Sequence, residues 1–176
     1  MKKCLIVVDF QNDFVSGALG FPGAENLDNY IAEKIKEYRE NNGEIIFTFD
    51  THGENYLNTQ EGKNLPVPHC LKDTEGHNLY GLTADLILDS DKKFYKNTFG
   101  SDGLYMYLKT ELFESVELVG LVSNICVLAN AVLAKTAQPE TQIIVDAKCT
   151  ASFDNNINGA ALDVMAGLQI KIINRE

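Results

Sequence analysis

The clearest structural pattern in this chain is in residues 115–137, SVELVGLVSNICVLANAVLAKTA. They begin with an apolar run over residues 116–122 and end in an alanine-rich segment, residues 126–137, that contains no glycine or proline. The first part is typical of a buried strand, and the second is rich in strong helix formers. We therefore expect a strand that feeds a helix through a tight turn, with Ser123 or Asn124 as the helix cap.

Cys126 falls in the first turn of that helix. The unpaired amide groups and the positive end of the helix dipole favour a thiolate there, the form in which cysteine acts as a nucleophile. The alternative is that Cys126 is a small buried core residue, which is the commoner role of a lone cysteine. The choice between the two depends on the residues at the ends of the other strands.

The composition is that of a globular protein. Of its 176 residues, 45% are hydrophobic, which is enough for one continuous core, so we expect a single domain over residues 1–176. The net charge of −10 argues against a nucleic-acid partner. No apolar stretch approaches the roughly 20 residues that span a bilayer, and the N-terminal segment is typical of a strand rather than a signal peptide. We expect a cytoplasmic protein without a membrane partner, and the oligomeric state, a homo-oligomer included, stays open.

The four cysteines are widely spaced along the chain. They are Cys4, Cys70, Cys126 and Cys149, and no two of them form a C-x-x-C pair. A disulfide framework and a zinc finger built from thiolates are both poor fits to this spacing. A reducing compartment is the default for such a sequence.

Segments typical of strands alternate with segments of helical periodicity along the whole sequence. The expected strands are 3–10, 44–50, 93–96, 116–122, 142–146 and 169–173, and the expected helices are 26–42, 82–88, 104–112, 126–137 and 155–167. Gly43 is expected to end the helix before it. This alternation predicts a doubly wound, mostly parallel six-stranded α/β sheet with helices on both faces, a three-layer α/β/α fold.

The segment between residues 51 and 81 has no clear periodicity and contains two prolines. A structureless loop of that length is uncommon in a compact domain unless it carries function. The segment also holds all three histidines of the chain, His52, His69 and His77. We therefore expect a functional loop over about residues 50–81.

Reactive side chains stand at the ends of the predicted strands. Asp9, Asp50 and Lys96 end the first three strands, and Cys126 follows the fourth. Each has an ordinary structural explanation by itself, such as a turn cap or a solvated strand end. Because parallel sheets bind ligands at the carboxyl ends of their strands, the joint placement of these residues predicts a site at that edge.

A metal site is expected in the same place. Asp50 and His52 are two residues apart where a loop leaves a strand, so both can reach one ion. His69 ends the stiff segment PVPH and can return to that ion, with Glu61 or water completing the shell. Histidine and carboxylate ligands suit Zn²⁺, with Mn²⁺ or Fe²⁺ as alternatives, and a site that keeps a water position is of the catalytic type. His77 is expected to be an ordinary loop residue.

With these histidines assigned to a metal, the base for Cys126 becomes Asp9. A carboxylate on a buried strand end, beside Lys96 and a thiol, can hold or pass one proton. Asp9, Lys96 and Cys126 are therefore expected to form a catalytic triad in which the carboxylate takes the proton of the thiol.

Three motifs resemble those of the isochorismatase-like cysteine hydrolases. The opening DFQNDF, residues 9–14, is similar to the D-x-Q-N-D-F of that family. DTH at 50–52 with PVPH at 66–69 resembles the metal motif of its nicotinamidase/pyrazinamidase branch, and GLVSNICV, residues 120–127, resembles its nucleophile turn. The motifs cover essentially the whole chain in the order that the family has them.

The resemblance implies the residues of the site. They are Asp9, Lys96 and Cys126 for the triad, and Asp50, His52, His69 and Glu61 for a divalent metal. The resemblance also implies a cis peptide bond between Val122 and Ser123. This bond would aim the amides of Ile125 and Cys126 as an oxyanion hole.

The residues expected to contact the substrate are inferred from one difference between this chain and many nicotinamidases. Many nicotinamidases have tryptophan between the metal-binding aspartate and histidine, whereas this chain has Thr51 there and no tryptophan at all. The aromatic residues expected to contact a substrate ring instead are Phe14, Tyr95, Phe99 and Tyr105. Phe14 best matches a pocket position of the family.

The resemblance implies a small-molecule amide substrate. The expected reaction is hydrolysis of nicotinamide to nicotinic acid and ammonia through a cysteine thioester, with the metal either orienting the ring nitrogen or activating a water for deacylation. Another small amide, a ureido compound or a vinyl ether is the alternative substrate. A binding protein of the same fold that has lost catalysis is the alternative outside enzymes.

Overall fold

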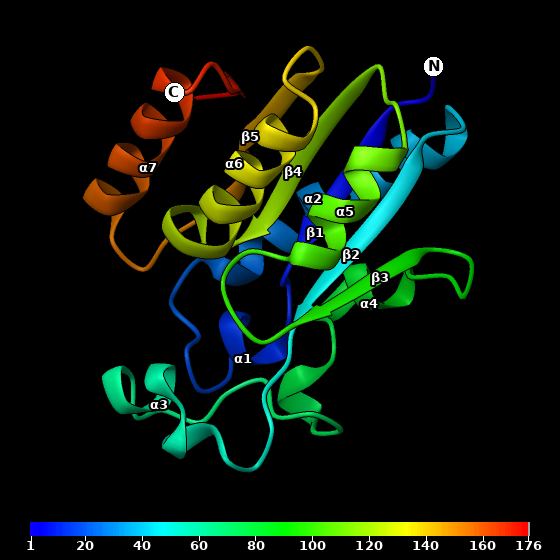
Figure 1. The fold of residues 1–176 in the computed structure, drawn as a ribbon. Coiled ribbons are helices and arrows are strands. Elements are labelled where there is room, and N and C mark those ends of the chain that lie inside the picture. The colour runs from blue at the N-terminus through cyan, green and yellow to red at the C-terminus, as the bar shows by residue number, and fades with distance from the viewer. Residues whose placement is uncertain (176) are drawn as a thin grey trace.

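The strands form one six-stranded, fully parallel sheet in a computed structural model that describes residues 1–175. They are β1 Cys4–Val8, β2 Glu44–Asp50, β3 Lys92–Lys96, β4 Ser115–Leu121, β5 Gln142–Ala151 and β6 Lys171–Ile173. Their order across the sheet is β3-β2-β1-β4-β5-β6 (Figure 1). The predicted doubly wound parallel fold is confirmed, and the order reverses between β1 and β4, where such sheets bind ligands.

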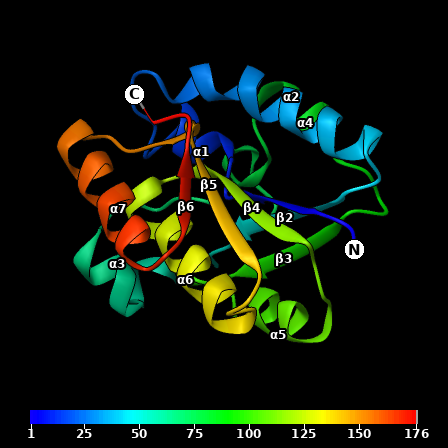
Figure 2. The same cartoon turned by 90° about the horizontal axis from the view of Figure 1, so that it is seen from above.

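Helices cover both faces of the sheet. They are α1 Asn12–Val15, α2 Leu27–Glu40, α3 Gln60–Asn64, α4 Gly81–Asp85, α5 Asp102–Thr110, α6 Leu128–Ala137 and α7 Asn155–Gly167. Figure 2 shows α2 and α4 over one face and α5, α6 and α7 over the other. Among residues 1–175, none of the helices combines the length and the hydrophobicity that a membrane span requires.

The core lies on both sides of the central strand β1. Cys4, Ile6 and Val8 belong to the apolar cluster beneath α5, α6 and α7, whereas Leu5 and Val7 belong to the one beneath α2. All five side chains are buried. Because successive side chains of a strand face opposite sides, a strand covered on both faces needs the continuous apolar run that the sequence has here.

β5 is longer than the predicted strand 142–146. The register between β4 and β5 shifts between Leu118 and Gly120, after which Gly120 pairs with Thr150 and Leu121 with Ala151. Sequence periodicity ends at Asp146 because the shift breaks the alternation of buried side chains.

Asn42, rather than the predicted Gly43, takes the left-handed conformation that ends α2, with φ 56°. The N–H of Asn42 donates to the carbonyl of Arg39, and the N–H of Gly43 donates to the carbonyl of Tyr38 at 2.7 Å. This is a Schellman-type ending, in which asparagine tolerates the left-handed position and the glycine comes one residue later.

The segment 51–81 lies beyond the carboxyl ends of the strands (Figure 1). It is not structureless: it holds α3 and the 3₁₀ turns Tyr56–Asn58 and Glu75–His77, and α4 follows at its end. The predicted helix 82–88 is this α4, and a short helix, α1, follows β1, where no helix is expected from the sequence. These elements are too short to show a helical period in the sequence.

Candidate active site

The three predicted catalytic residues meet at the carboxyl ends of β1, β3 and β4. The ammonium nitrogen Nζ of Lys96 lies 2.5 Å from Asp9 Oδ2 and 3.7 Å from Cys126 Sγ. It also donates a hydrogen bond of 2.9 Å to the carbonyl oxygen of Thr98. Asp9 is fully buried, and Lys96 and Cys126 are each 5% exposed. One ammonium group therefore holds both the carboxylate and the thiol.

The neighbouring strand β2 fixes the carboxylate of Asp9. Asp9 has φ 44°, a left-handed conformation that aspartate tolerates better than most residues. Thr48 Oγ1 donates to Asp9 Oδ1 at 2.6 Å, and the N–H of Asp9 donates to the carbonyl of Thr48 at 3.2 Å. These bonds leave Oδ2 for Lys96.

β4 approaches β1 closely just before the nucleophile turn. Gly120 has φ 111°, and a Cβ atom at this position would lie 2.1 Å from the carbonyl oxygen of Val8. Only glycine suits both the conformation and the space. The glycine of the nucleophile motif therefore brings the turn after β4 against the strand that carries Asp9.

Burial and charge at the site shift the pKa of Cys126 in the opposite direction from the sequence-based expectation. Burial raises the pKa of the Cys126 thiol, and the charge of Asp9 raises it further, against Lys96. Burial also raises the pKa of Asp9, again against Lys96. Burial alone would lower the pKa of Lys96, but the neighbouring carboxylates, Asp9 above all, outweigh burial and raise it, so the lysine stays protonated. The direction of the Cys126 shift is thus opposite to the depressed pKa expected from the helix N-terminus, and the raised pKa of Asp9 makes its carboxylate a stronger base for the thiol proton.

The turn that carries Cys126 is a π-helical turn, Ser123–Val127, that continues directly into α6. The N–H groups of Ile125 and Val127 both donate to the carbonyl oxygen of Val122, each at 3.2 Å. The Ile125 amide, one of the two predicted oxyanion donors, is thus bonded within the turn. π-Turns of this kind are frequent at functional sites.

Two details of this turn correct the sequence-based prediction. The cis peptide bond joins Leu121 to Val122, one residue before the predicted position between Val122 and Ser123. β4 ends at Leu121, so the change of direction comes there and Ser123 already belongs to the turn. Val122 precedes the first turn, and neither Ser123 nor Asn124 caps it with a side chain.

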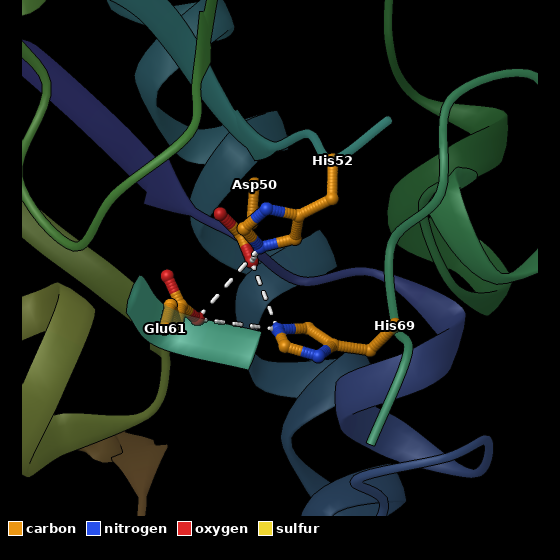
Figure 3. Close-up of side chains that lie close together, drawn as sticks. All are labelled: Asp50, His52, Glu61 and His69. Carbon is orange, nitrogen blue, oxygen red and sulfur yellow. Dashed lines mark hydrogen bonds and ion pairs between the residues drawn. The ribbon is translucent and has the colours of Figure 1, made fainter. Parts of the chain in front are cut away.

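The four predicted metal ligands converge on one another (Figure 3). Lys96 Nζ lies 3.6 Å from Asp50 Oδ1, so this cluster is beside the triad. His52 Nε2 lies 3.0 Å from Asp50 Oδ2 and 3.8 Å from Glu61 Oε1, and His69 Nε2 lies 3.3 Å and 3.7 Å from the same two atoms. A tetrahedral ion with bonds of about 2.0–2.1 Å places its ligand atoms ~3.3 Å apart. The four distances lie on both sides of that value, so the donor set fits a zinc-sized ion.

The motif DFQNDF holds the metal loop in place. Gln11 donates to the carbonyl of Asp50 at 2.9 Å and accepts from its N–H at 2.8 Å. Asp13 accepts from the N–H of Cys70 at 2.7 Å, and the N–H of His52 donates to the carbonyl of Cys70. These bonds bring residue 69 beside the end of β2. The motif was recognised in the sequence, but this positioning role depends on tertiary contacts.

The two histidines are oriented by partners that the sequence did not indicate. The imidazole of His69 lies with Nδ1 2.8 Å from the carbonyl oxygen of Val67, so Nδ1–H donates there and Nε2 is the ring nitrogen that faces the cluster and could bind a metal. The buried ring of Tyr56 packs edge-on against His52 and His69, with ring centroids 4.7 and 5.0 Å away. Its hydroxyl donates to the carbonyl of Leu65.

Charge in this cluster favours a cation. Burial would raise the pKa of Asp50, but hydrogen bonds from His52 and His69 outweigh burial and lower it, so Asp50 stays ionised. Burial and the charge of Asp50 raise the pKa of Glu61. A divalent ion between these two carboxylates would remove that repulsion.

A cavity of about 590 Å³ opens beside both groups. Its lining includes His52 and Glu61 from the metal cluster, Ile125 from the nucleophile turn, and the aromatic residues Tyr56 and Phe99. Of the four aromatic residues predicted to contact a substrate ring, Phe99 lines this cavity. A ligand in this cavity can reach the nucleophile turn and the metal cluster together.

The other three aromatic residues are not among the described residues that line this cavity. Phe14 is buried and packs edge-on against His69, with ring centroids 5.5 Å apart. Tyr95 precedes Lys96 in β3, so its side chain takes the opposite direction and stacks on Phe49. Tyr105 packs from α5 against the apolar core.

His77 lies outside the metal cluster, in line with its prediction as an ordinary loop residue. Its Nε2 atom is 2.8 Å from Thr51 Oγ1, and its ring stacks on Tyr95 with centroids 6.1 Å apart. Thr51 also donates to the carbonyl of Phe49. The residue that replaces the family's tryptophan is therefore tied to the edge of the sheet.

Comparison with known proteins agrees with this geometry. A model of the isochorismatase domain matches residues 3–176. The chain belongs to the isochorismatase family. A family member from Bacillus subtilis, the isochorismatase family protein PncA, is 31% identical over an alignment of 179 positions that covers 94% of this chain and 95% of that protein. The nicotinamidase/pyrazinamidase of Mycobacterium tuberculosis is 25% identical, over 97% of this chain and 98% of its own.

Solved structures of the family superpose along the whole chain. The pyrazinamidase/nicotinamidase of Streptococcus mutans has a TM-score of 0.87 and 29% identity over 98% of this chain and 100% of its own. The pyrazinamidase of Pyrococcus horikoshii, in complex with zinc, shares the fold with a TM-score of 0.85 and 24% identity over 99% and 100% of the two chains. The chain is thus a hydrolase of this family, related to its nicotinamidase/pyrazinamidase branch.

Proposed function

We propose that this chain is an amidohydrolase that converts nicotinamide to nicotinic acid and ammonia. The observation that carries the proposal is that Cys126, with Asp9 and Lys96, lies beside a histidine and carboxylate cluster, with Lys96 Nζ 3.6 Å from Asp50 Oδ1. A cavity lined by His52 and Glu61 of that cluster and by Ile125, the residue before Cys126, opens there. The nicotinamidase/pyrazinamidase PncA of Bacillus subtilis, whose structure has 28% identity and a TM-score of 0.86 over 98% of this chain, supports the substrate class.

The first half of the reaction forms a thioester. Asp9 takes the proton of the Cys126 thiol as the sulfur attacks the amide carbon. The amide of Cys126 stabilises the oxyanion, and the amide of Ile125 joins it by sharing its bond to Val122; one such donor is worth roughly 3–4 kcal/mol. Asp9 then passes the proton to the leaving nitrogen, which departs as ammonia.

The second half restores the enzyme. Asp9 takes a proton from a water molecule, whose oxygen attacks the thioester carbon. The C–S bond breaks, the proton returns to the sulfur of Cys126, and nicotinic acid is released. Lys96 keeps its charge throughout and holds the carboxylate and the sulfur in contact.

Asp50, His52, Glu61 and His69 would hold a divalent cation, zinc first, with manganese or iron as alternatives. When bound, this ion supplies a Lewis-acid contact for the ring nitrogen of the substrate. The ring of Tyr56 would orient the imidazoles of His52 and His69 toward this ion, and the carbonyl of Val67 would fix the imidazole of His69.

Replacing His52 by alanine should lower bound metal well below one ion per chain, since the variant loses one of four ligands. His77→Ala is the matched control, because His77 lies in the same segment but outside the cluster, and it should keep the metal content of the unmutated protein. Elemental analysis after purification without chelator or affinity tag gives the result. An unmutated protein without transition metal, or equal loss in both variants, would exclude the metal site.

The substrate is tested with four amides. Nicotinamide and pyrazinamide both place a ring nitrogen meta to the carboxamide, benzamide has none, and picolinamide has it ortho. A site built around one polar contact rejects an analogue that lacks it by as much as about 10⁴–10⁵-fold. Water can fill the vacant position at an open metal cluster, so we expect benzamide and picolinamide to be slower by on the order of 10²-fold.

Ammonia release from the four amides at equal concentration decides the proposal. Equal rates for benzamide and nicotinamide would remove the contact to the ring nitrogen. Release from none of the four would refute nicotinamide hydrolysis and direct the search to the ureido compounds and vinyl ethers.

A further inference from the structure

Asn130 is a fully buried amide on α6, one helical turn after Cys126. Its Oδ1 atom accepts a hydrogen bond of 3.0 Å from the N–H of Ser101. Its Nδ2 atom donates to the carbonyl of Cys126 at 2.8 Å and to the carbonyl of Phe99 at 3.1 Å. The oxygen of the amide faces an N–H group, and its NH₂ group faces two carbonyls. Only one orientation of the amide satisfies all three hydrogen bonds.

The segment that Asn130 holds, residues 97–101, is the pocket loop. It is neither helix nor strand, so tertiary bonds fix its position. The carbonyl of Thr98 accepts the ammonium group of Lys96, and Phe99 lines the cavity beside the nucleophile turn. The pocket loop thus supplies part of the environment of Lys96 and one wall of the cavity.

We propose that Asn130 is a positioning residue that holds the nucleophile turn and the pocket loop in register. Through the carbonyl of Cys126 it contacts the turn, and through Phe99 and Ser101 it contacts the loop. The distance between Lys96 Nζ and Cys126 Sγ, 3.7 Å, depends on both. A displacement of about 1 Å at reacting groups can cost about 10²-fold in rate, so this bridge controls the reaction without touching the substrate.

Gln138 is a second buried amide, and its replacement distinguishes a positioning role of Asn130 from a contribution to stability alone. It ends α6 at the opposite terminus and is also buried, at 4% exposed. Its Nε2 atom donates to the carbonyls of Leu108 and Glu111, at the end of α5. Gln138 is therefore also a buried amide that donates to two carbonyls, but it joins the opposite end of α6 to the end of α5, far from Cys126, and is a matched control.

The test compares Asn130→Ala with Gln138→Ala, and its activity readout rests on the proposed function. Both variants should lower the Tm, because each leaves buried carbonyls without donors. At a temperature well below both transitions, Asn130→Ala should lower kcat for nicotinamide by at least about tenfold, with a smaller change in KM, because reacting groups rather than binding contacts are displaced. Gln138→Ala should keep kcat within about twofold of the unmutated protein.

Amide hydrogen exchange in the pocket loop gives a second readout that needs no substrate. Protection at residues 98–101 should fall in Asn130→Ala and stay unchanged in Gln138→Ala. If the unmutated protein hydrolyses none of the four amides, the proposed function fails, and exchange alone still decides whether Asn130 holds the pocket loop.

Asn130→Asp covers the case in which the alanine variant does not fold. Aspartate keeps the size and the oxygen that faces the N–H of Ser101, but it places an acceptor opposite the carbonyls of Phe99 and Cys126. It should show the same loss of kcat and of protection. Values equal to those of Gln138→Ala in both Asn130 variants would overturn the proposal.

Discussion

Replacing Cys126 by alanine should lower nicotinamide hydrolysis by at least about 10⁴-fold, as losses of nucleophiles do in other hydrolases. Without the sulfur no thioester forms, and Asp9 has no thiol proton to take. Alanine removes one atom from a buried site, so the variant should fold and keep its metal. Ammonia release measured as kcat/KM checks this expectation.

Cys149→Ala is the control for this variant. Cys149 is as buried as Cys126, lies on β5 and takes no part in the reaction. Its replacement should cost stability but leave kcat/KM within about twofold. If the two variants retained equal activity, Cys126 would not be the nucleophile.

The second large effect is expected for Asp9→Asn, which should lower kcat by about 10²–10⁴-fold. Asparagine keeps the shape of the side chain and the contact with Thr48, but it cannot accept the thiol proton and leaves Lys96 without its countercharge. Metal content and fold should persist. Steady-state ammonia release with elemental analysis of the same sample separates loss of the base from loss of the site.

Asp28→Asn is the matched control for Asp9. Asp28 is also a buried carboxylate, but it accepts from Leu82 and Thr83 where α2 contacts α4, away from the site. Its replacement should lower the Tm with little change in kcat. Turnover near that of the unmutated protein in Asp9→Asn would remove Asp9 from the mechanism.

The features that sequence reasoning recovered are those that local patterns encode. Apolar runs and helical periods are properties of short windows, so all six strands were found. Asp9, Lys96 and Cys126 were placed together because parallel strands bring their carboxyl ends to one edge. Asp50 and His52 are recognisable as metal ligands because both lie at the carboxyl end of one strand, at the same edge of the sheet.

The features that it missed depend on contacts between distant segments. The helix that carries Cys126 predicts a lowered pKa for its thiol. Burial, and the charge of Asp9 from another strand, raise that pKa instead. Tyr95 and Tyr105 were chosen by residue type, whereas their directions are decided by strand parity in β3 and by the buried face of α5. Asn130 carries no motif, and its role follows only from the carbonyls that surround it.

Trapping of the thioester shows whether the reaction passes through a covalent bond to Cys126. With hydroxylamine present during nicotinamide turnover, a thioester on Cys126 is shared between water and hydroxylamine, so nicotinohydroxamic acid should appear at the expense of nicotinic acid. The proportion of hydroxamate should rise with hydroxylamine concentration, and Cys126→Ala should form neither product above background. Nicotinic acid as the sole product at every hydroxylamine concentration, or hydroxamate formed equally by Cys126→Ala, would contradict a covalent mechanism at this cysteine.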